Sequence, residues 1–175
     1  ITQHIKSLAS KGYRVIGVAS ALHTESQLPA MQDDFNWKFQ GILAFYDPPK
    51  KNIPGVLKKF YDAKIDVKMI TGDYAETAVN IAGQVGIFNH LKCITGEQVM
   101  SMKEDELLRV VKNSNVFARM FPDAKLKVID ALKANGEIVA MTGDGVNDGP
   151  ALKSASIGIA MGQKDTEIAR QAADL

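Results

Sequence analysis

Two segments of this chain repeat one pattern, an apolar run that ends in Thr-Gly-Asp. The first covers residues 67–73 (VKMITGD) and the second covers residues 138–144 (IVAMTGD). A strand that stops at a polar, glycine-containing turn before a helix is the repeating unit of a parallel sheet. The repeat therefore predicts an α/β fold in which helices cover both faces of a parallel sheet.

The rest of the chain alternates in the same way. Helices are predicted over residues 1–12 and 75–85, from Asn52, after a Ser101–Glu104 capping box, from Pro122, from Pro150 and from about Asp165. Strands are predicted at 13–21, 37–46, 66–70, around Ile94, and at 115–118, 138–141 and 157–161, the first of them buried. The stiff proline pair in Asp47-Pro48-Pro49 marks the best hinge candidate.

Composition excludes several classes of protein. The 175 residues are 46% hydrophobic, which predicts a packed core, and the net charge of +1 without a basic run argues against a nucleic-acid partner. Cys93 is the only cysteine, so an internal disulfide is impossible. No apolar stretch approaches the roughly 18 residues of a membrane span, so we expect this polypeptide to be soluble as given.

The second Thr-Gly-Asp turn carries several oxygen ligands. Asp144 and Asp148 lie four residues apart with Asn147 between them, at the carboxyl end of a predicted strand. Open α/β sheets bind ligands at this edge, and hard oxygen donors suit Mg²⁺. The spacing predicts a magnesium site, and the alternative is an ordinary polar turn with an N-capping Asp.

Two further residues indicate a phosphoryl group. The Thr71 hydroxyl and the N–H groups after it stand at a strand end before a helix, where phosphoryl oxygens bind. Lys125 lies in the first turn of its helix, where the helix dipole disfavours a cation, so either an anion or mere solvent exposure explains it. With the Asp pair, these residues predict phosphoryl transfer. Asp47 is rejected as the nucleophile because Pro48 and Pro49 replace a phosphate-cradling loop.

At this point the motifs resemble a known family. Residues 41–175 resemble the cytoplasmic ATP-hydrolysing region of P-type cation pumps, members of the haloacid-dehalogenase superfamily. The similar segments are Asp47-Pro-Pro-Lys50, Met69-Ile-Thr-Gly-Asp73, Phe117-Ala-Arg119 with Pro122 and Lys125, Thr142-Gly-Asp-Gly-Val-Asn-Asp148, and Ile157-Gly-Ile-Ala-Met-Gly162. Residues 1–40 resemble the last helix and strand of the nucleotide-binding domain.

The resemblance implies a three-layer, Rossmann-like parallel sheet of the haloacid-dehalogenase type that lacks its first, nucleophile-bearing strand. It divides the chain into a nucleotide-binding remnant (1–40), a hinge (41–50) and an incomplete phosphorylation domain (51–175). The implied roles are Mg²⁺ binding by Asp144 with support from Asp148, phosphoryl binding by Thr71 and Gly72, neutralisation by Lys125, and contacts with ATP or around the site by Asp73, Arg119 and Asn147. Two positions depart from the family pattern, with Lys50 in place of Arg and Gly149 in place of Ala.

The family's Asp-Lys-Thr-Gly-Thr segment, which carries the phosphorylated Asp, does not occur in the sequence. We therefore expect a catalytically inactive piece of an integral membrane pump. The implied partners are ATP, Mg²⁺ and the pump's actuator, nucleotide-binding and transmembrane domains, with this piece on the cytoplasmic side. The missing strand should leave unpaired edges, filled by strand 13–21, by strand 37–46 or by self-association.

Two other functions stay open. One is a naturally nucleophile-free domain of the same type that binds Mg²⁺ and phosphate and acts as a regulatory module. The other is a soluble phosphatase, which predicts hydrolysis of phosphate esters by this chain. The motifs suggest a type II, calcium-like pump, but the ion is set by ligands inside the membrane that this sequence does not contain.

Overall fold

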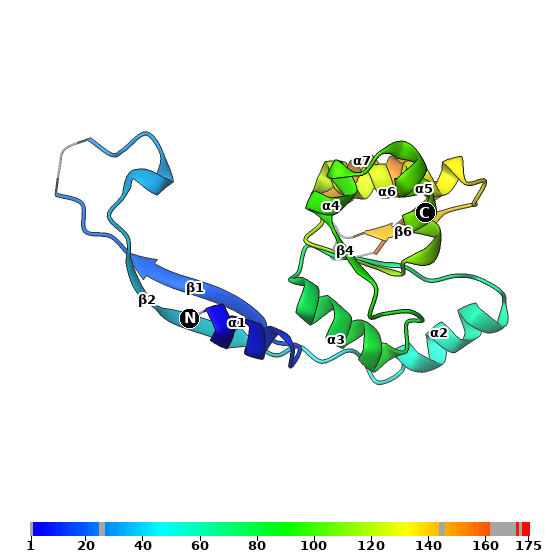
Figure 1. The fold of residues 1–175 in the computed structure, drawn as a ribbon, viewed down its shortest axis with the longest axis horizontal. Coiled ribbons are helices and arrows are strands. Elements are labelled where there is room, and N and C mark those ends of the chain that lie inside the picture. Colours follow the sequence, from blue (N-terminus) through cyan, green and yellow to red (C-terminus); the bar gives the residue numbers. More distant parts are fainter. Residues whose placement is uncertain (1, 25–26, 144–145, 162–170, 172) are drawn as a thin grey trace.

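The computed structural model describes residues 2–24, 27–143, 146–161, 171 and 173–175. They form a compact body and an arm that reaches away from it, as Figure 1 shows. The arm consists of α1 (Thr2–Ala9), β1 (Arg14–Ser20), a short 3-10 helix η1 (Gln32–Asp34) and β2 (Lys38–Phe45). Strands β1 and β2 pair antiparallel to form a hairpin.

The body alternates helices and strands. Its elements are α2 (Ile53–Asp62), β3 (Met69–Ile70), α3 (Ala75–Val85), β4 (Cys93–Thr95), α4 (Gly96–Ser101), α5 (Glu104–Asn113), β5 (Val116–Ala118), α6 (Pro122–Ala134), β6 (Ala140–Gly143), η2 (Val146–Asp148), α7 (Gly149–Ser154) and β7 (Ile157–Ala160). All pairings among these strands are parallel, in the orders β3-β5-β4 and β6-β7. The predicted α/β class is therefore confirmed.

Strand β5 separates two hydrophobic cores because successive side chains of a strand point to opposite faces. Val116 and Ala118 pack with residues of α2 and α3, whereas Phe117 packs with residues of α4, α5 and α6. All three side chains are fully buried. Helices thus cover both faces of the sheet, which gives the predicted three layers.

The residues at two helix ends confirm one prediction and contradict another. Gly86 ends α3 in the left-handed conformation with φ 85°, as predicted. The predicted capping box at Ser101 is wrong, because Ser101 is the last residue of α4 and its hydroxyl bonds back to Gln98. The capping box of this region is instead formed by Thr95 and Gln98 at the start of α4. The helix predicted from Asp165 begins outside the described residues.

The parallel strands form two ladders that are not hydrogen-bonded to each other. Within the described residues β3 pairs with β5, and β6 pairs with β7, so one edge of β3 and one edge of β6 have no strand beside them. The hypothesis that strand 13–21 or strand 37–46 fills this gap is wrong, because β1 and β2 pair with each other and belong to the arm. Filling of the gap by another chain stays a prediction.

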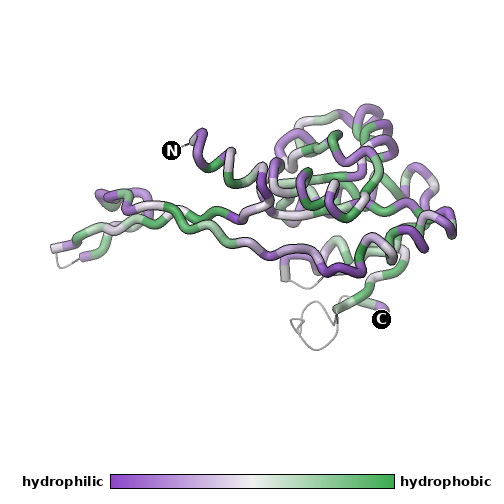
Figure 2. The backbone as a smooth tube through the Cα atoms, turned by 90° about the horizontal axis from the view of Figure 1, so that it is seen from below, coloured by the Kyte–Doolittle hydropathy of each residue, from purple (hydrophilic) through white to green (hydrophobic). Residues whose placement is uncertain are grey.

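The arm exposes many apolar side chains, so the prediction that strand 13–21 is buried is also wrong. Ile16 is 47% exposed, and Phe39 and Leu43 on the paired strand are 48% and 52% exposed. Green apolar segments run along the extended arm in Figure 2. An apolar strand sequence predicts burial only where a second layer covers the strand, and the described residues supply no such layer to this hairpin.

None of the helices within the described ranges is long and apolar enough to cross a membrane.

The core under α7 provides a direct test of this architecture. Leu152 is fully buried with Ile129 and Met141, whereas Leu91 is 79% exposed. We predict that Leu152→Ala lowers the free energy of unfolding by about 3 to 5 kcal/mol, because it leaves a cavity in a packed core. Leu91→Ala is the matched control and should change it by less than about 0.5 kcal/mol. Urea denaturation measures both, and equal effects would contradict the packing described.

Candidate functional site

The first Thr-Gly-Asp turn follows β3 and is bonded to the chain that leaves β5. The Thr71 N–H donates to the Phe117 carbonyl (2.9 Å), and the Thr71 carbonyl accepts from the Met120 N–H (3.0 Å). The Arg119 N–H donates to the Asp73 carbonyl (2.9 Å). Three backbone hydrogen bonds therefore hold residues 71–73 and 117–120 side by side at the carboxyl edge of the sheet.

The Thr71 side chain is fixed within its own turn. Its Oγ1 accepts a hydrogen bond from the Asp73 N–H (3.1 Å), so the hydroxyl proton takes no part in that bond. Thr71 is half-buried and Gly72 is exposed. The turn thus presents a hydroxyl donor and a glycine backbone at the place where the sequence predicted a phosphoryl group.

Arg119 adopts a backbone conformation that is unusual for a residue with a side chain. Its φ is 50°, in the left-handed region, and the bonds on either side of it hold it there. Its guanidinium lies 5.7 Å from the centre of the Tyr74 ring, within the range of a cation–π interaction. The predicted site residues Asp73 and Arg119 are therefore brought together, with Tyr74 as a neighbour that sequence reasoning missed.

Lys125 and Asp148 form the best-buried charged contact at this edge. Lys125 Nζ lies 2.6 Å from Asp148 Oδ1, and the two side chains are 13% and 12% exposed. Lys125 belongs to α6, and Asp148 stands just before α7, where the helix dipole favours an anion. Lys125 is therefore not the solvent-exposed lysine of the alternative interpretation, and Asp148 itself accounts for a cation at the start of α6.

Gly143 makes room for this pair. A Cβ at Gly143 would lie 2.7 Å from the Asp148 Cβ, a distance that real side chains do not reach. The Asp148 side chain makes no N-cap hydrogen bond to α7 and turns to Lys125 instead. Asp148 thus stands at the N-cap position of α7 without capping it through its side chain, whereas Asp144 of the same turn lies outside the described residues.

The two groups of site residues meet through the core beneath them. Ile70, just before the first turn, packs against the cluster that contains Met141, just before the second. The ends of β3 and β6 thus lie near each other although they share no ladder. Asn147 is exposed beside Asp148, and Asp144 lies outside the described residues.

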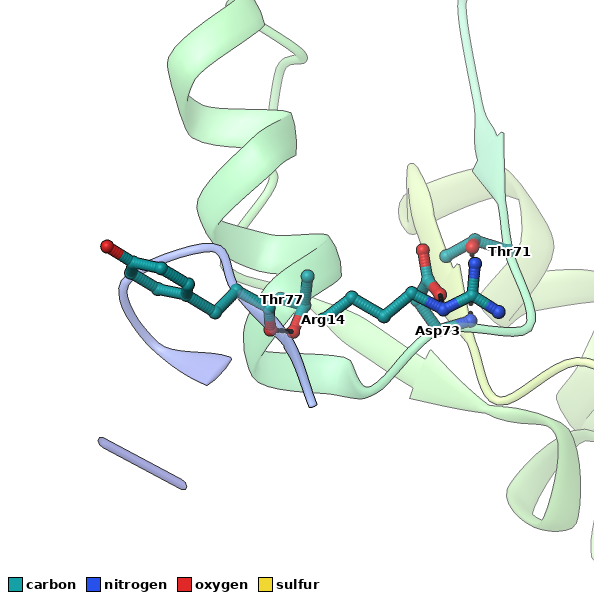
Figure 3. Close-up of polar contacts among 5 residues, drawn as sticks. Arg14, Thr71, Asp73 and Thr77 are labelled. Atoms are coloured by element: carbon teal, nitrogen blue, oxygen red, sulfur yellow. Dashed lines mark hydrogen bonds and ion pairs between the residues drawn. The ribbon is translucent and has the colours of Figure 1, made fainter. Parts of the chain in front are cut away.

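Arg14 of the arm also reaches the first turn, and the sequence interpretation gave it no role. Its Nε lies 4.0 Å from Asp73 Oδ1, with side chains 74% and 39% exposed. Figure 3 shows the Arg14 side chain extending toward the turn that holds Thr71 and Asp73. A single Arg at the start of an apolar strand carries no recognisable signal, so only the structure could place it here.

The described oxygen donors at this edge of the sheet are of the type that binds Mg²⁺, but they are too few to form a metal site by themselves. Asp148 offers a buried carboxylate next to a strand end, and carboxylate oxygens are preferred magnesium ligands. Within the described ranges no three His, Cys, Asp or Glu side chains cluster closely enough to hold a metal by themselves. The described carboxylates alone therefore do not supply a complete set of Mg²⁺ ligands.

The one cysteine is a poor candidate nucleophile. Cys93 opens β4 and is half-buried, and burial raises the pKa of its thiol. It also stands at the amino end of its strand, whereas the site residues lie at the carboxyl edge. Cys93 is therefore poorly placed to act as a nucleophile at the carboxyl edge of the sheet.

Comparison with known proteins identifies the family. The profile of haloacid dehalogenase-like hydrolases matches residues 5–156. The chain belongs to this family. In this haloacid dehalogenase-like chain, the described site residues Thr71, Gly72 and Asp73 follow the carboxyl end of a parallel strand.

Its relatives confirm the resemblance to cation pumps. The chain is 39% identical to calcium-transporting ATPase 1 of Saccharomyces cerevisiae, over 100% of the chain and 19% of the relative. It is 41% identical to calcium-transporting ATPase type 2C member 2 of Rattus norvegicus, over 99% of the chain and 17% of the relative. A putative cation-transporting ATPase of Methanocaldococcus jannaschii is 38% identical, with 100% and 21% covered. The chain thus spans about a fifth of these pumps.

The buried ion pair predicts a specific pattern of stability. Lys125→Met should lower the free energy of unfolding by about 3 kcal/mol, because it leaves the buried Asp148 carboxylate without its cation. Lys125→Met combined with Asp148→Asn should recover much of that loss, since the uncompensated charge is gone. Lys153→Met, at an exposed position of α7, is the control and should have little effect. Urea denaturation of the four proteins checks this, and additive losses in the double variant would contradict a coupled pair.

Proposed function

We propose that this chain is the phosphorylation domain, with the end of the nucleotide-binding domain, of a P-type cation pump. In this proposal the whole pump hydrolyses ATP through an aspartyl-phosphate and couples that reaction to cation transport across a membrane. The observation that carries the proposal is the buried Lys125–Asp148 pair at the same sheet edge as the Thr71 turn. The similarity to calcium- and cation-transporting ATPases along the whole chain supports it.

Each site residue has a role in this proposal. Thr71 donates its hydroxyl proton, and Gly72 its backbone N–H, to phosphoryl oxygens. Asp144 and Asp148 hold Mg²⁺, which when bound would neutralise charge on the transferred group. The remaining residues, Asp73, Arg119 and Asn147, contact ATP or support the residues that do.

Lys125 serves both Asp148 and the phosphoryl group in this arrangement. An ammonium group carries three protons, and one of them suffices for the bond to Asp148 Oδ1. The others can be donated to phosphoryl oxygens without breaking the ion pair. Because Lys125 is already desolvated and oriented, little reorganisation opposes its stabilisation of a developing charge.

The phosphorylated Asp would be carried by a strand between β3 and β6. Both strands have an edge without a partner strand in the described structure, and Ile70 at the end of β3 packs against the core cluster that contains Met141 of β6. A strand pairing with both would place its carboxyl end beside Thr71 and Lys125. The chain by itself would then be catalytically inactive and prone to self-association through the same edges. The whole pump would lie in a membrane, with this part on the cytoplasmic side.

Adding the missing strand tests the proposal. We predict that a polypeptide containing a strand followed by Asp-Lys-Thr-Gly-Thr binds this chain and becomes phosphorylated by radiolabelled acetyl phosphate in the presence of Mg²⁺. The label should be released by hydroxylamine, as expected for an acyl phosphate. Lys125→Met should reduce labelling about 10²-fold or more, because a charge-stabilising donor is lost.

Two controls sharpen this experiment. The same polypeptide with Asn in place of its Asp should bind equally well and take no label. Binding without labelling of the Asp-containing form would contradict the proposal and favour a regulatory module that only binds Mg²⁺ and phosphate. Mg²⁺-dependent hydrolysis of phosphate esters by the chain alone would instead support a soluble phosphatase.

A further inference from the structure

A second contact between arm and body lies beside the Thr71 turn. Residues 10–14, which we call the elbow, connect α1 to β1 and lie against one face of α3. The only covalent link from arm to body is the segment 46–52, which contains Pro48 and Pro49. The position of the arm relative to the body therefore depends on how the elbow is held.

Two side chains of α3 hold the elbow by its backbone. Thr77 Oγ1 donates to the Tyr13 carbonyl (3.2 Å), and Asn80 Nδ2 donates to the Ser10 carbonyl (2.8 Å). Thr77 is only 3% exposed, and Ala9 at the end of α1 is 2% exposed, so the contact is closely packed. Figure 3 shows the Thr77 side chain meeting the elbow.

The amide of Asn80 is oriented by a third residue. Gln84 Nε2 donates to Asn80 Oδ1 (2.5 Å), one helical turn along α3. This bond fixes the oxygen on one side, so the Asn80 NH₂ group is directed at Ser10. The α3 surface is thus already arranged to receive the elbow.

The elbow in turn is shaped by Gly12. Its φ is 85°, in the left-handed region, and an added Cβ would lie 2.8 Å from Asn80 Oδ1. The left-handed φ favours glycine here. An added Cβ would in addition have to displace the Asn80 amide, which donates to the Ser10 carbonyl.

Docking of the elbow also positions the Arg14 side chain opposite Asp73. Arg14 is the last residue of the elbow and the first of β1, and its Nε lies 4.0 Å from Asp73 Oδ1. Between the two parts lies a cleft of about 280 Å³, lined from the arm by residues that include Ile5, Tyr13 and Arg14 and from the body by Asp73, Tyr74 and Thr77. Moving the elbow off α3 would withdraw Arg14 and open this cleft.

We propose that the elbow and the Thr77–Asn80 face of α3 form a latch that sets the position of the arm and thereby whether Arg14 stands at the Thr71–Asp73 turn. The latch is polar and small, with two side-chain hydrogen bonds and one ion pair, so it can open without disrupting either core. Its effect on the phosphoryl site rests on the proposed function, whereas the docking itself does not.

The test measures the distance between arm and body in the whole chain. Cysteines are introduced by Lys38→Cys on β2 and Lys112→Cys on α5, and Cys93→Ser removes the native thiol. A spin label is attached to each introduced cysteine, and pulsed electron paramagnetic resonance measures the distance between the two labels. We expect one narrow distance distribution for the parent. Asn80→Ala and Thr77→Val should each add a population at other distances, because each lost hydrogen bond shifts the docked-to-open ratio by roughly 2- to 12-fold.

Two glycine variants distinguish loss of the latch from a general effect of backbone strain. Gly12→Ala should broaden the distribution, whereas Gly136→Ala should not, although Gly136 has a similar φ of 82° and no atom within 4 Å of an added Cβ. Hydrogen exchange of residues 71–77 should rise in Gly12→Ala, Asn80→Ala and Thr77→Val, and it should stay unchanged in Gly136→Ala. A broad distance distribution in the parent protein would refute the latch. Unchanged distances in all the α3 and Gly12 variants would also refute it, as would equal broadening of the distance distribution in Gly136→Ala. Failure of phosphorylation with intact docking would contradict only the proposed function.

Discussion

The structure depends on the position of β5 between two cores. Its three residues are fully buried, and they pack against helices on both sides of the sheet. β5 also lies between β3 and β4, so its carboxyl end fixes the chain that binds the Thr71 turn. The same three residues thus join the layers and place half of the candidate site. Their burial and the three backbone hydrogen bonds hold residues 71–73 and 117–120 side by side at the carboxyl edge.

The other half of the site depends on the balance of energies at Lys125 and Asp148. Desolvating two charges costs several kcal/mol per ion, and a bond of 2.6 Å between them offsets much of that cost. The pair therefore adds little net stability, although removing one partner is expensive. The pair instead fixes the position of charged groups, because it joins α6 to the start of α7 and holds a cation at the sheet edge. Such an arrangement suits a reaction that depends on neutralising charge, because the cation does not move when the charge develops.

Much of this could be predicted from periodicity and turn residues. The strand before Thr71, the strand that contains Met141 and the α6 helix follow from apolar spacing, because buried faces repeat at the period of the element. The exposure of β1 could not be predicted, since a strand sequence does not reveal whether a second layer covers it. Nor could the Arg14–Asp73 contact, which joins residues 59 positions apart through the docking of an arm. The capping box was misplaced because Ser101 and Thr95 both stand three residues before a glutamate or glutamine, and only packing decides which one begins a helix.

The unpaired edges of β3 and β6 and the candidate site depend on the same hydrophobic core. A two-stranded ladder such as β6–β7 is marginal alone, and here α6 and α7 stabilise it through the core around Met141 and Leu152. That core lies below the strands, so it leaves the β6 edge open without loosening Asp148 above it. Ile70 brings the β3 edge to the same core. On the proposed function, an Asp-bearing strand that enters between them would find both ladders and the Lys125–Asp148 pair already in place, so its insertion would be a local event and would not require the domain to refold.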